Sequence, residues 1–117
     1  MTVVASKYAR IANDLYQTEP WATRVYARHF PVAGRSFWEP AAGNHLIADT
    51  LLDEGAASVF TSDIAVYDRP HHLIFDFLND PRTVDCQADD IMTNPPYGAG
   101  NRDAVQFARL ALARCTG

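Results

Sequence analysis

The sequence is poor in the residue patterns typical of disulfide-bonded and metal-binding proteins. It has two cysteines, Cys86 and Cys115, which lie far apart and form no C-x-x-C motif. We interpret them as a pair of reduced thiols. His71 and His72 are adjacent, so their side chains diverge on a strand or a helix, and no cysteine or acidic residue stands at zinc-ligand spacing from them. We therefore expect no metal site.

Long apolar runs and an excess of positive charge are also lacking. No stretch approaches the ~20 apolar residues that cross a bilayer, and residues 1–17 lack the apolar core of a signal peptide. We expect a cytoplasmic protein with no membrane partner. Ten basic residues stand against 14 acidic ones, for a formal charge of −4. This is the wrong sign for a module that binds nucleic acid through phosphate contacts alone, so such binding would need a local basic patch or another domain.

The composition is that of one globular domain. Of the 117 residues, 48% are hydrophobic and 11% aromatic, and there is no repeat or low-complexity tract. A chain of this length buries somewhat under ~70% of the surface that its unfolded form exposes. We treat residues 1–117 as a single domain with an adequate core.

Helical periodicity is the first structural signal along the chain. It predicts a helix over residues 5–16, whose apolar positions are Tyr8, Ile11, Ala12 and Leu15. A capping segment at Thr18-Glu19 followed by Pro20 predicts a second helix that runs to about Phe30. We expect its inward-facing side chains to be Trp21, Val25, Ala27 and Phe30.

Strands alternate with helices in the remainder. Residues 36–38 read as a strand that stops at Glu39-Pro40, residues 46–54 as a helix, and residues 57–61 as a second strand that closes with 62–64. Such alternation predicts an α/β fold with a parallel sheet and flanking helices. Residues 65–87 give no clear pattern.

A third strand and a last helix are predicted after residue 87. The strand covers residues 90–93, and the helix covers residues 102–114 with Asn101 as its cap. The apolar stripe of this helix would be formed by Val105, Phe107, Ala108 and the residues from Leu110 to Leu112.

Three polar clusters follow predicted strands, at residues 39–44, at Asp63 and at residues 94–97. Because the carboxyl ends of parallel strands share one sheet edge, we expect the clusters to converge there. The small residues 41–43 let a ligand approach the backbone, and the Asp63 carboxylate can accept two ribose hydroxyls. A single glycine in a turn and an aspartate at a strand end are also ordinary structural features. Asn94-Pro95-Pro96-Tyr97 is rarer, since two prolines remove two backbone donors and fix two φ angles, and it favours a functional role.

Four segments together resemble the class I S-adenosylmethionine-dependent methyltransferases. They are EPAAG at 39–43, SDI at 62–64, DF at 76–77 and TNPPY at 93–97, in this order and spacing. The N6-adenine DNA methyltransferases, which have an Asn-Pro-Pro-Tyr catalytic turn, are the most similar. YQTEPWAT at 16–23 also resembles the segment that those enzymes place before the first strand. The resemblance covers roughly residues 14–114 and implies a Rossmann-like fold, S-adenosylmethionine as cofactor and DNA as substrate.

The resemblance also implies roles for individual residues. The methionyl and ribose region of the cofactor would be lined by Tyr16, Thr18, Glu39, Ala41 and Gly43. Asp63 would hold the ribose hydroxyls, and Asp76 and Phe77 would contact the adenine through its amino group and ring face. Asn94, at the edge of the cofactor, and Pro95 would accept hydrogen bonds from the target amine, Pro96 would hold these acceptors rigid, and Tyr97 would stack on the target base.

Methyl transfer to an exocyclic amine explains this turn chemically. The lone pair of the adenine amine is delocalised into the ring, and two acceptors aimed at its N–H groups localise the lone pair toward the methyl sulfonium. Rigid placement matters because an error of about 1 Å can cost on the order of 10²-fold in rate. A base in a duplex must be flipped out to reach the turn, and stacking on an aromatic ring recovers roughly 1–3 kcal/mol of that cost.

Two departures from the family pattern leave alternatives open. His45 stands where these enzymes commonly have a second glycine, so it either hinders close approach of the cofactor or faces solvent. Relatives continue after the last helix with three further strands and a target-recognition region, so we expect the C-terminal strands to be missing or supplied by a second polypeptide. A methyltransferase acting on RNA or on protein glutamine, and a truncated non-catalytic cofactor-binding or interaction module, remain alternative functions.

Overall fold

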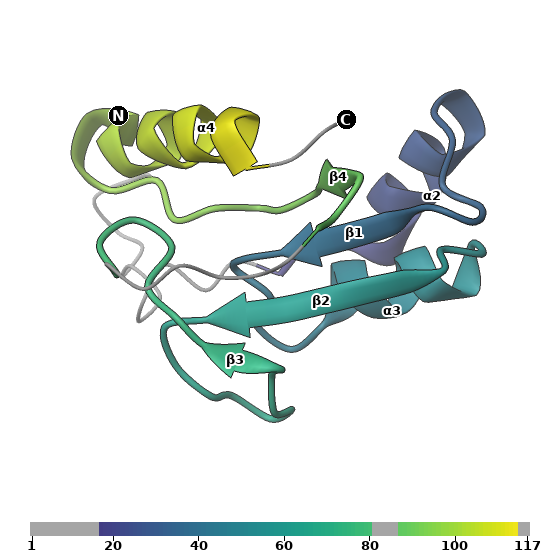
Figure 1. Cartoon of the computed structure of the whole chain (residues 1–117), viewed down its shortest axis with the longest axis horizontal. Helices are drawn as coiled ribbons and strands as arrows, with labels where there is room; N and C mark the ends of the chain where they lie inside the picture. The colour runs from purple at the N-terminus through teal and green to yellow at the C-terminus, as the bar shows by residue number, and fades with distance from the viewer. Residues whose placement is uncertain (1–16, 81–86, 115–117) are drawn as a thin grey trace, which may run out of the picture.

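The computed structural model describes residues 17–80 and 87–114. The expected helix over 5–16, Tyr16, Cys86 and Cys115 lie outside the described residues. The described elements, in chain order, are α2 (Pro20–His29), β1 (Ser36–Glu39), α3 (Leu46–Asp53), β2 (Ser58–Asp63), β3 (Leu73–Ile74), β4 (Asp90–Ile91), η2 (Ala99–Asn101) and α4 (Arg102–Arg114) (Figure 1).

The strands form one parallel sheet in the order β3-β2-β1-β4. The predicted parallel α/β architecture is confirmed. In the register of the sheet, Trp38 lies between Phe60 of β2 and Ile91 of β4. The strand expected over 90–93 pairs over Asp90–Ile91 only, and one further bond, from Met92 N–H to Trp38 O at 3.2 Å, extends the contact. Strand order reverses between β1 and β4, which is where an open parallel sheet binds its ligand.

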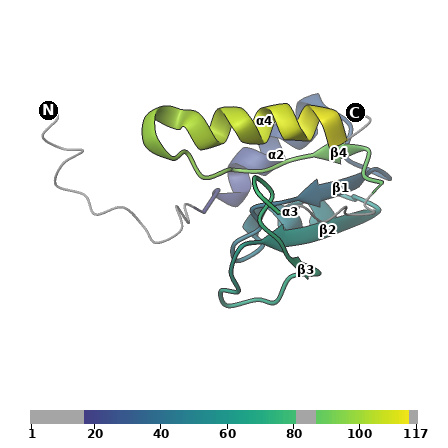
Figure 2. The same ribbon diagram turned by 60° about the vertical axis from the view of Figure 1, so that its left-hand side comes forward.

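Alternation along β1 divides the core between the two faces of the sheet. Phe37 faces α2 and α3, in a cluster with Ile47, Leu51 and Val59. Trp38 faces α4 instead, and its Nε1–H donates to Ser62 Oγ at 2.9 Å inside the core. The cluster around Trp38 also contains Phe75, Phe77, Ala88 and Phe107. Figure 2 shows α4 running over β4, with the other strands following in order down to β3. Burial of both faces explains why β1 and β2 have no polar-apolar alternation.

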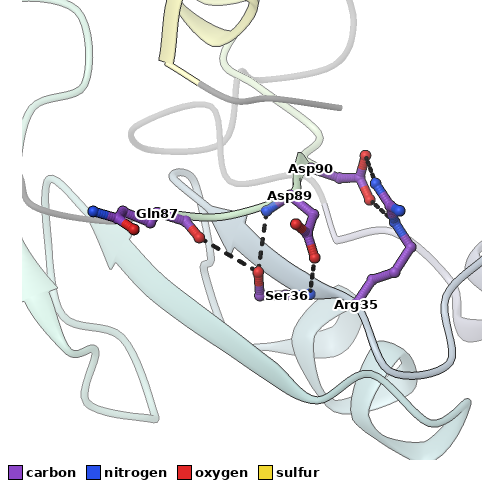
Figure 3. Close-up of polar contacts among 5 residues, drawn as sticks. All are labelled: Arg35, Ser36, Gln87, Asp89 and Asp90. Atoms are coloured by element: carbon purple, nitrogen blue, oxygen red, sulfur yellow. Dashed lines mark hydrogen bonds and ion pairs between the residues drawn. The ribbon is translucent and has the colours of Figure 1, made fainter.

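Polar contacts at the amino end of β4 attach this short strand to β1 (Figure 3). The Arg35 guanidinium makes a two-pronged contact with the Asp90 carboxylate, at 2.7 and 3.1 Å. Next to it, Ser36 N–H donates to Asp89 Oδ2 at 3.0 Å and Asp89 N–H donates to Ser36 Oγ at 3.1 Å. The Ser36 N–H contact is the main reason that the pKa of Asp89 lies below its usual value. These bonds hold the start of β4 in register with β1.

The inward face of α2 differs from the predicted one. Trp21 is 69% exposed, and Val25 and Phe30 are exposed as well. The side that meets α3 and the core carries Thr23, Tyr26 and Ala27. Apolar residues occupy two sides of this helix, so periodicity alone did not distinguish them. Phe30 follows the last helical residue in an extended conformation, and its ring stacks on Tyr26 with centroids 4.9 Å apart.

The predicted stripe of α4 is also only partly correct. Val105, Ala108 and Leu112 are exposed. The side toward the sheet consists of Phe107, Leu110 and Ala111. Asn101 is not a side-chain cap: it has a left-handed conformation with φ 62°, and Tyr97 O accepts the N–H of Asp103 at 3.1 Å. Within 17–80 and 87–114, no helix is both long enough and apolar enough to cross a membrane.

Candidate functional site

A cavity of about 440 Å³ opens where β1 and β2 end. It collects nine of the residues singled out in the sequence, namely Thr18, Glu39, Ala41, Gly43, Asp63, Asp76, Phe77, Asn94 and Pro96. Pro95 and Tyr97 are not among its lining residues. The three polar clusters that follow β1, β2 and β4 therefore meet at one place, although they are up to 57 positions apart in the chain.

The charged residues that line the cavity are acidic. Four acidic side chains line it, those of Glu39, Asp63, Asp76 and Asp103, and no lysine, arginine or histidine does so among the described residues. Acidic side chains accept hydrogen bonds from hydroxyl and amino groups and attract cations, whereas they repel phosphates. The cavity therefore favours ligand groups that donate hydrogen bonds or carry positive charge over phosphate groups.

Asp63 is positioned by the turn after β1. Gly43 N–H donates to its Oδ2 at 2.9 Å, and Ile64 N–H donates to its Oδ1 at 2.7 Å. Gly43 has φ 55°, a conformation that glycine adopts without strain. Each carboxylate oxygen has more than one acceptor position, so Asp63 remains able to receive two ribose hydroxyls. Its assignment to the ribose stays a prediction, with a geometry that permits it.

Glu39 lies at the base of the cavity. Glu39 as a whole is only 1% exposed, and its Oε1 accepts the N–H of Ala41 at 2.9 Å. Burial raises the pKa of Glu39 from 4.5 to about 8, with a further contribution from the negative charge of Asp63, against the opposing effects of Thr93 and Ala41 N–H. At neutral pH this carboxyl group is mostly protonated.

Asp76 and Phe77 contact protein groups that the sequence did not predict. Asp76 Oδ1 accepts the N–H of Leu78 at 3.0 Å, and its Oδ2 accepts Asn79 Nδ2–H at 3.1 Å. The Phe77 residue is 1% exposed, and its ring packs against Trp38 and Phe107.

The predicted contact of Phe77 with the ring face of an adenine stays a prediction: the residue lines the cavity, but most of its ring surface packs against the protein. The Arg114 guanidinium also lies 4.8 Å from the ring centroid, so protein groups occupy the surroundings of the ring. Leu46, Ile64 and Leu78 also line the cavity and are less buried, so they are apolar side chains that a planar ligand could contact.

The Asn94–Tyr97 turn lies at the side of the cavity nearest α4. Asn94 and Pro96 line the cavity, together with Asp103 and Phe107 of α4. Tyr97 is 41% exposed, and its hydroxyl donates to Asn94 Oδ1 at 2.9 Å. This contact uses one acceptor position of the oxygen that the resemblance assigns to the target amine. A second position remains on the same oxygen.

His45 does not face solvent, as one of the two expectations had it, and its effect on cofactor approach stays a prediction. It begins α3 with φ 68°, the backbone conformation that a glycine would favour, but its side chain is buried and points away from the cavity. Its Nε2 lies 2.8 Å from His71 Nδ1, and His71 Nε2 lies 2.9 Å from Ala65 O. Burial, followed by the nearby His71, lowers the pKa of His45. The described residues contain no cluster of three or more histidine, cysteine or acidic side chains placed to hold a metal ion.

Seven lining residues lie outside the segments singled out in the sequence: Leu46, Ile47, Tyr67, Leu78, Asn79, Asp103 and Phe107. Leu78 and Asn79 directly follow Asp76-Phe77, so a wider window would have included them, and the other apolar ones lie in predicted helices. Tyr67 lies in the segment without a clear pattern. Gly98 and Gly100 could have pointed to Asp103, because a glycine in a tight turn permits close contact with a side chain that follows it.

Gly98 shows that contact and supports a prediction. It has φ 67° and ψ −170°, and a Cβ at this position would lie 2.6 Å from Asp103 Cγ. We expect Gly98→Ala to lower the free energy of unfolding by about 2–3 kcal/mol, from backbone strain and the clash together. Gly100→Ala is the matched control: its φ is 60° with no atom within 4 Å of the new Cβ, so we expect a loss of about 1 kcal/mol. Urea denaturation measures both, and equal losses would contradict the proposed contact.

Comparison with known proteins bears on the fold. No family model and no curated protein matches the sequence. Among solved structures, the crystal structure of a Pyrococcus horikoshii protein proposed to be an RNA methyltransferase superposes with a TM-score of 0.67 and 15% sequence identity. The chain has the Rossmann-like fold of methyltransferases. The superposition covers 93% of this chain and 63% of the other, so the chain spans less than two thirds of the length of that protein. At 15% identity the likeness extends to the fold alone.

Proposed function

We propose that the chain is the S-adenosylmethionine-binding part of a methyltransferase that acts on the N6 amine of adenine in DNA. The observation that carries the proposal is the placement of Asn94 and Pro96 in the same acidic cavity as Glu39 and Asp63. The cofactor is a nucleoside with two ribose hydroxyls, a sulfonium, an ammonium and one carboxylate, and it has no phosphate. Its net positive charge matches the acidic lining of the cavity.

The chain's own residues would act by binding and orientation. Asp63 would receive the ribose hydroxyls, while Asn94 Oδ1 and the Pro95 carbonyl would accept the N–H groups of the target amine. S-adenosylmethionine would supply the methyl group. The transfer would form a nitrogen–carbon bond while the sulfur–methyl bond of the cofactor breaks to give a thioether, and the proton of the amine would go to water. This needs no metal ligand and no covalent link to the protein.

Methyl transfer from labelled S-adenosylmethionine tests the proposal. The acceptors are a DNA oligonucleotide with adenines, an RNA of the same sequence and a glutamine peptide, each with the full chain. We expect labelled N6-methyladenine in DNA. Label in RNA would favour the function suggested for the structural neighbour, and label in the peptide would favour a glutamine methyltransferase. Cofactor binding without transfer to any acceptor would favour a non-catalytic binding module.

Arg102 supports a nucleic-acid acceptor despite the negative net charge. It is exposed, begins α4 directly before the cavity-lining Asp103, and forms no ion pair with the described residues. A phosphate contact at this position would lie beside the Asn94–Tyr97 turn. Arg28 is also exposed but lies at the end of α2, near the start of β1 and thus at the opposite sheet edge.

We expect Arg102→Gln to weaken DNA binding and to reduce the slope of log K against log salt by about 1. Arg28→Gln removes the same charge at the other edge and should leave the slope unchanged. Fluorescence anisotropy of a labelled oligonucleotide over a series of KCl concentrations measures both. Equal slopes for the wild type and Arg102→Gln would remove Arg102 from the interface.

We also propose that a further segment, from a second polypeptide, pairs with the outer edge of β4. β4 is an edge strand in the described sheet, with β1 as its neighbour. Unpaired strand edges favour the addition of another strand. The second polypeptide can be another copy of this chain, so sedimentation of the full chain as a monomer during methyl transfer would contradict this proposal.

A further inference from the structure

Glu39 is a buried acid in a cavity without a base. The groups that face it from neighbouring elements are Asp63 at the end of β2 and the Thr93 side chain beyond β4. The other titratable side chains that line the cavity are Asp76 and, on α4, Asp103. All of these are neutral or acidic, so none of the described side chains that face Glu39 carries a positive charge to pair with its carboxylate.

An isolated buried carboxylate is strongly disfavoured, and in practice such a group keeps its proton. One oxygen of Glu39 already accepts Ala41 N–H, which stabilises the charged form only in part. Burial outweighs that hydrogen bond, because the pKa of Glu39 is raised to about 8. A cation placed in the cavity would reverse this balance, since an opposite charge within ~4–6 Å favours the ionised form.

We propose that Glu39 is protonated in the empty cavity and releases this proton to solvent when an ammonium group of the ligand enters. The inference rests on the proposed function for the identity of the ligand, whose amino-acid part carries the ammonium group. The O–H bond of Glu39 breaks, the proton passes to the buffer, and the carboxylate pairs with the ammonium. No covalent bond of the ligand changes. Glu39 thereby makes the cavity selective for a ligand that places an ammonium group beside it, and makes the affinity for that ligand depend on pH.

Proton release can be measured with S-adenosylhomocysteine, which has the ammonium group and transfers no methyl group. Calorimetric titration of the full chain in two buffers of different ionisation enthalpy gives the number of protons exchanged. With a pKa of about 8, we expect about nine-tenths of a proton to be released at pH 7 and about a quarter at pH 8.5. The dissociation constant should rise about tenfold between pH 7 and pH 6.

Two controls isolate Glu39. The ligand 5′-methylthioadenosine keeps the nucleoside and the thioether but has no ammonium, and it should bind without proton release. Glu39→Gln should bind S-adenosylhomocysteine more weakly and without proton release at either pH. Equal release with both ligands, or no release with S-adenosylhomocysteine, would overturn the inference while leaving cofactor binding intact.

The free chain provides a test that does not need a ligand. The sequence has three glutamates, Glu19, Glu39 and Glu54, so a chain with ¹³C-labelled glutamate gives few carboxyl signals. We expect one signal, lost in Glu39→Gln, to titrate near pH 8. A Glu39 signal that titrates near its ordinary value would overturn the inference whether or not the cofactor binds. Failure of both ligands to bind, with Glu39 titrating near 8, would instead overturn the proposed function.

Discussion

Asn94→Ala is expected to lower the rate of methyl transfer at least ~10²-fold, with a much smaller change in the affinity for S-adenosylhomocysteine. The side-chain oxygen of Asn94 would act on the target amine in the transition state, so its loss should reduce kcat more than cofactor binding. Single-turnover methylation of a DNA oligonucleotide measures the rate, and calorimetry measures the affinity.

Two further variants test whether a lower rate of methyl transfer in Asn94→Ala comes from the side chain of Asn94 itself. Gln106→Ala removes an exposed amide from α4, outside the cavity, and should leave the rate unchanged. Tyr97→Phe removes only the hydroxyl that donates to Asn94 Oδ1, and it should keep most of the activity. If Tyr97→Phe lost as much activity as Asn94→Ala, the hydrogen bond between the two side chains would be what matters. Normal transfer by Asn94→Ala would remove this residue from the reaction.

Glu39→Gln is expected to stabilise the ligand-free protein at alkaline pH. The folded pKa of about 8 lies above the ordinary 4.5, so between these values the folded state holds a proton that the unfolded state has lost. Stability is therefore fully present below pH 4.5 and falls as the pH rises toward 8. Each pH unit between the two pKa values corresponds to about 1.4 kcal/mol in the free energy of unfolding. Between pH 5 and pH 8.5 we expect the wild type to lose about 4 kcal/mol through Glu39, and Glu39→Gln to avoid this loss.

Urea denaturation followed by circular dichroism at the two pH values measures the effect. Glu54→Gln is the matched control, because Glu54 is a partly exposed glutamate paired with Arg24 at 2.7 Å. Its replacement should change the free energy of unfolding by less than about 1 kcal/mol at either pH. A wild type and a Glu39→Gln variant with the same pH dependence would show that Glu39 ionises normally in the folded protein. The same variant should lose affinity for the cofactor, so stability and binding oppose one another at this residue.

Prediction from the sequence was most accurate where local chemistry decides the outcome. Pro20 at the start of α2, the strand around Phe37-Trp38 and the end of α3 before Gly55 were all located within about one residue. Proline, glycine and a run of β-formers act through their own backbone preferences, which do not depend on distant partners.

Side-chain burial was less predictable. Trp21 and Phe107 are both large aromatic residues at plausible helical positions, yet the first is exposed and the second is in the core. Phe77 is a similar case. The sequence indicated that Asp76-Phe77 belongs to the site, but the enclosure of the Phe77 ring by Trp38 and Phe107 depends on how α4 lies on the sheet. Which of two apolar helix faces meets the sheet is decided by packing with distant segments, and a periodic pattern contains no such information.

The sequence by itself determined the alternation of strands and helices, the parallel sheet that follows from it, and the rigid Asn94-Pro95-Pro96-Tyr97 corner, because these depend on backbone stereochemistry and on the handedness of crossovers. Only the tertiary structure decided that Glu39 is buried without a counter-charge, that Tyr97 bonds to Asn94, and that His45 turns away toward His71. These features depend on the dielectric and the partners that segments far apart in the chain provide for one another.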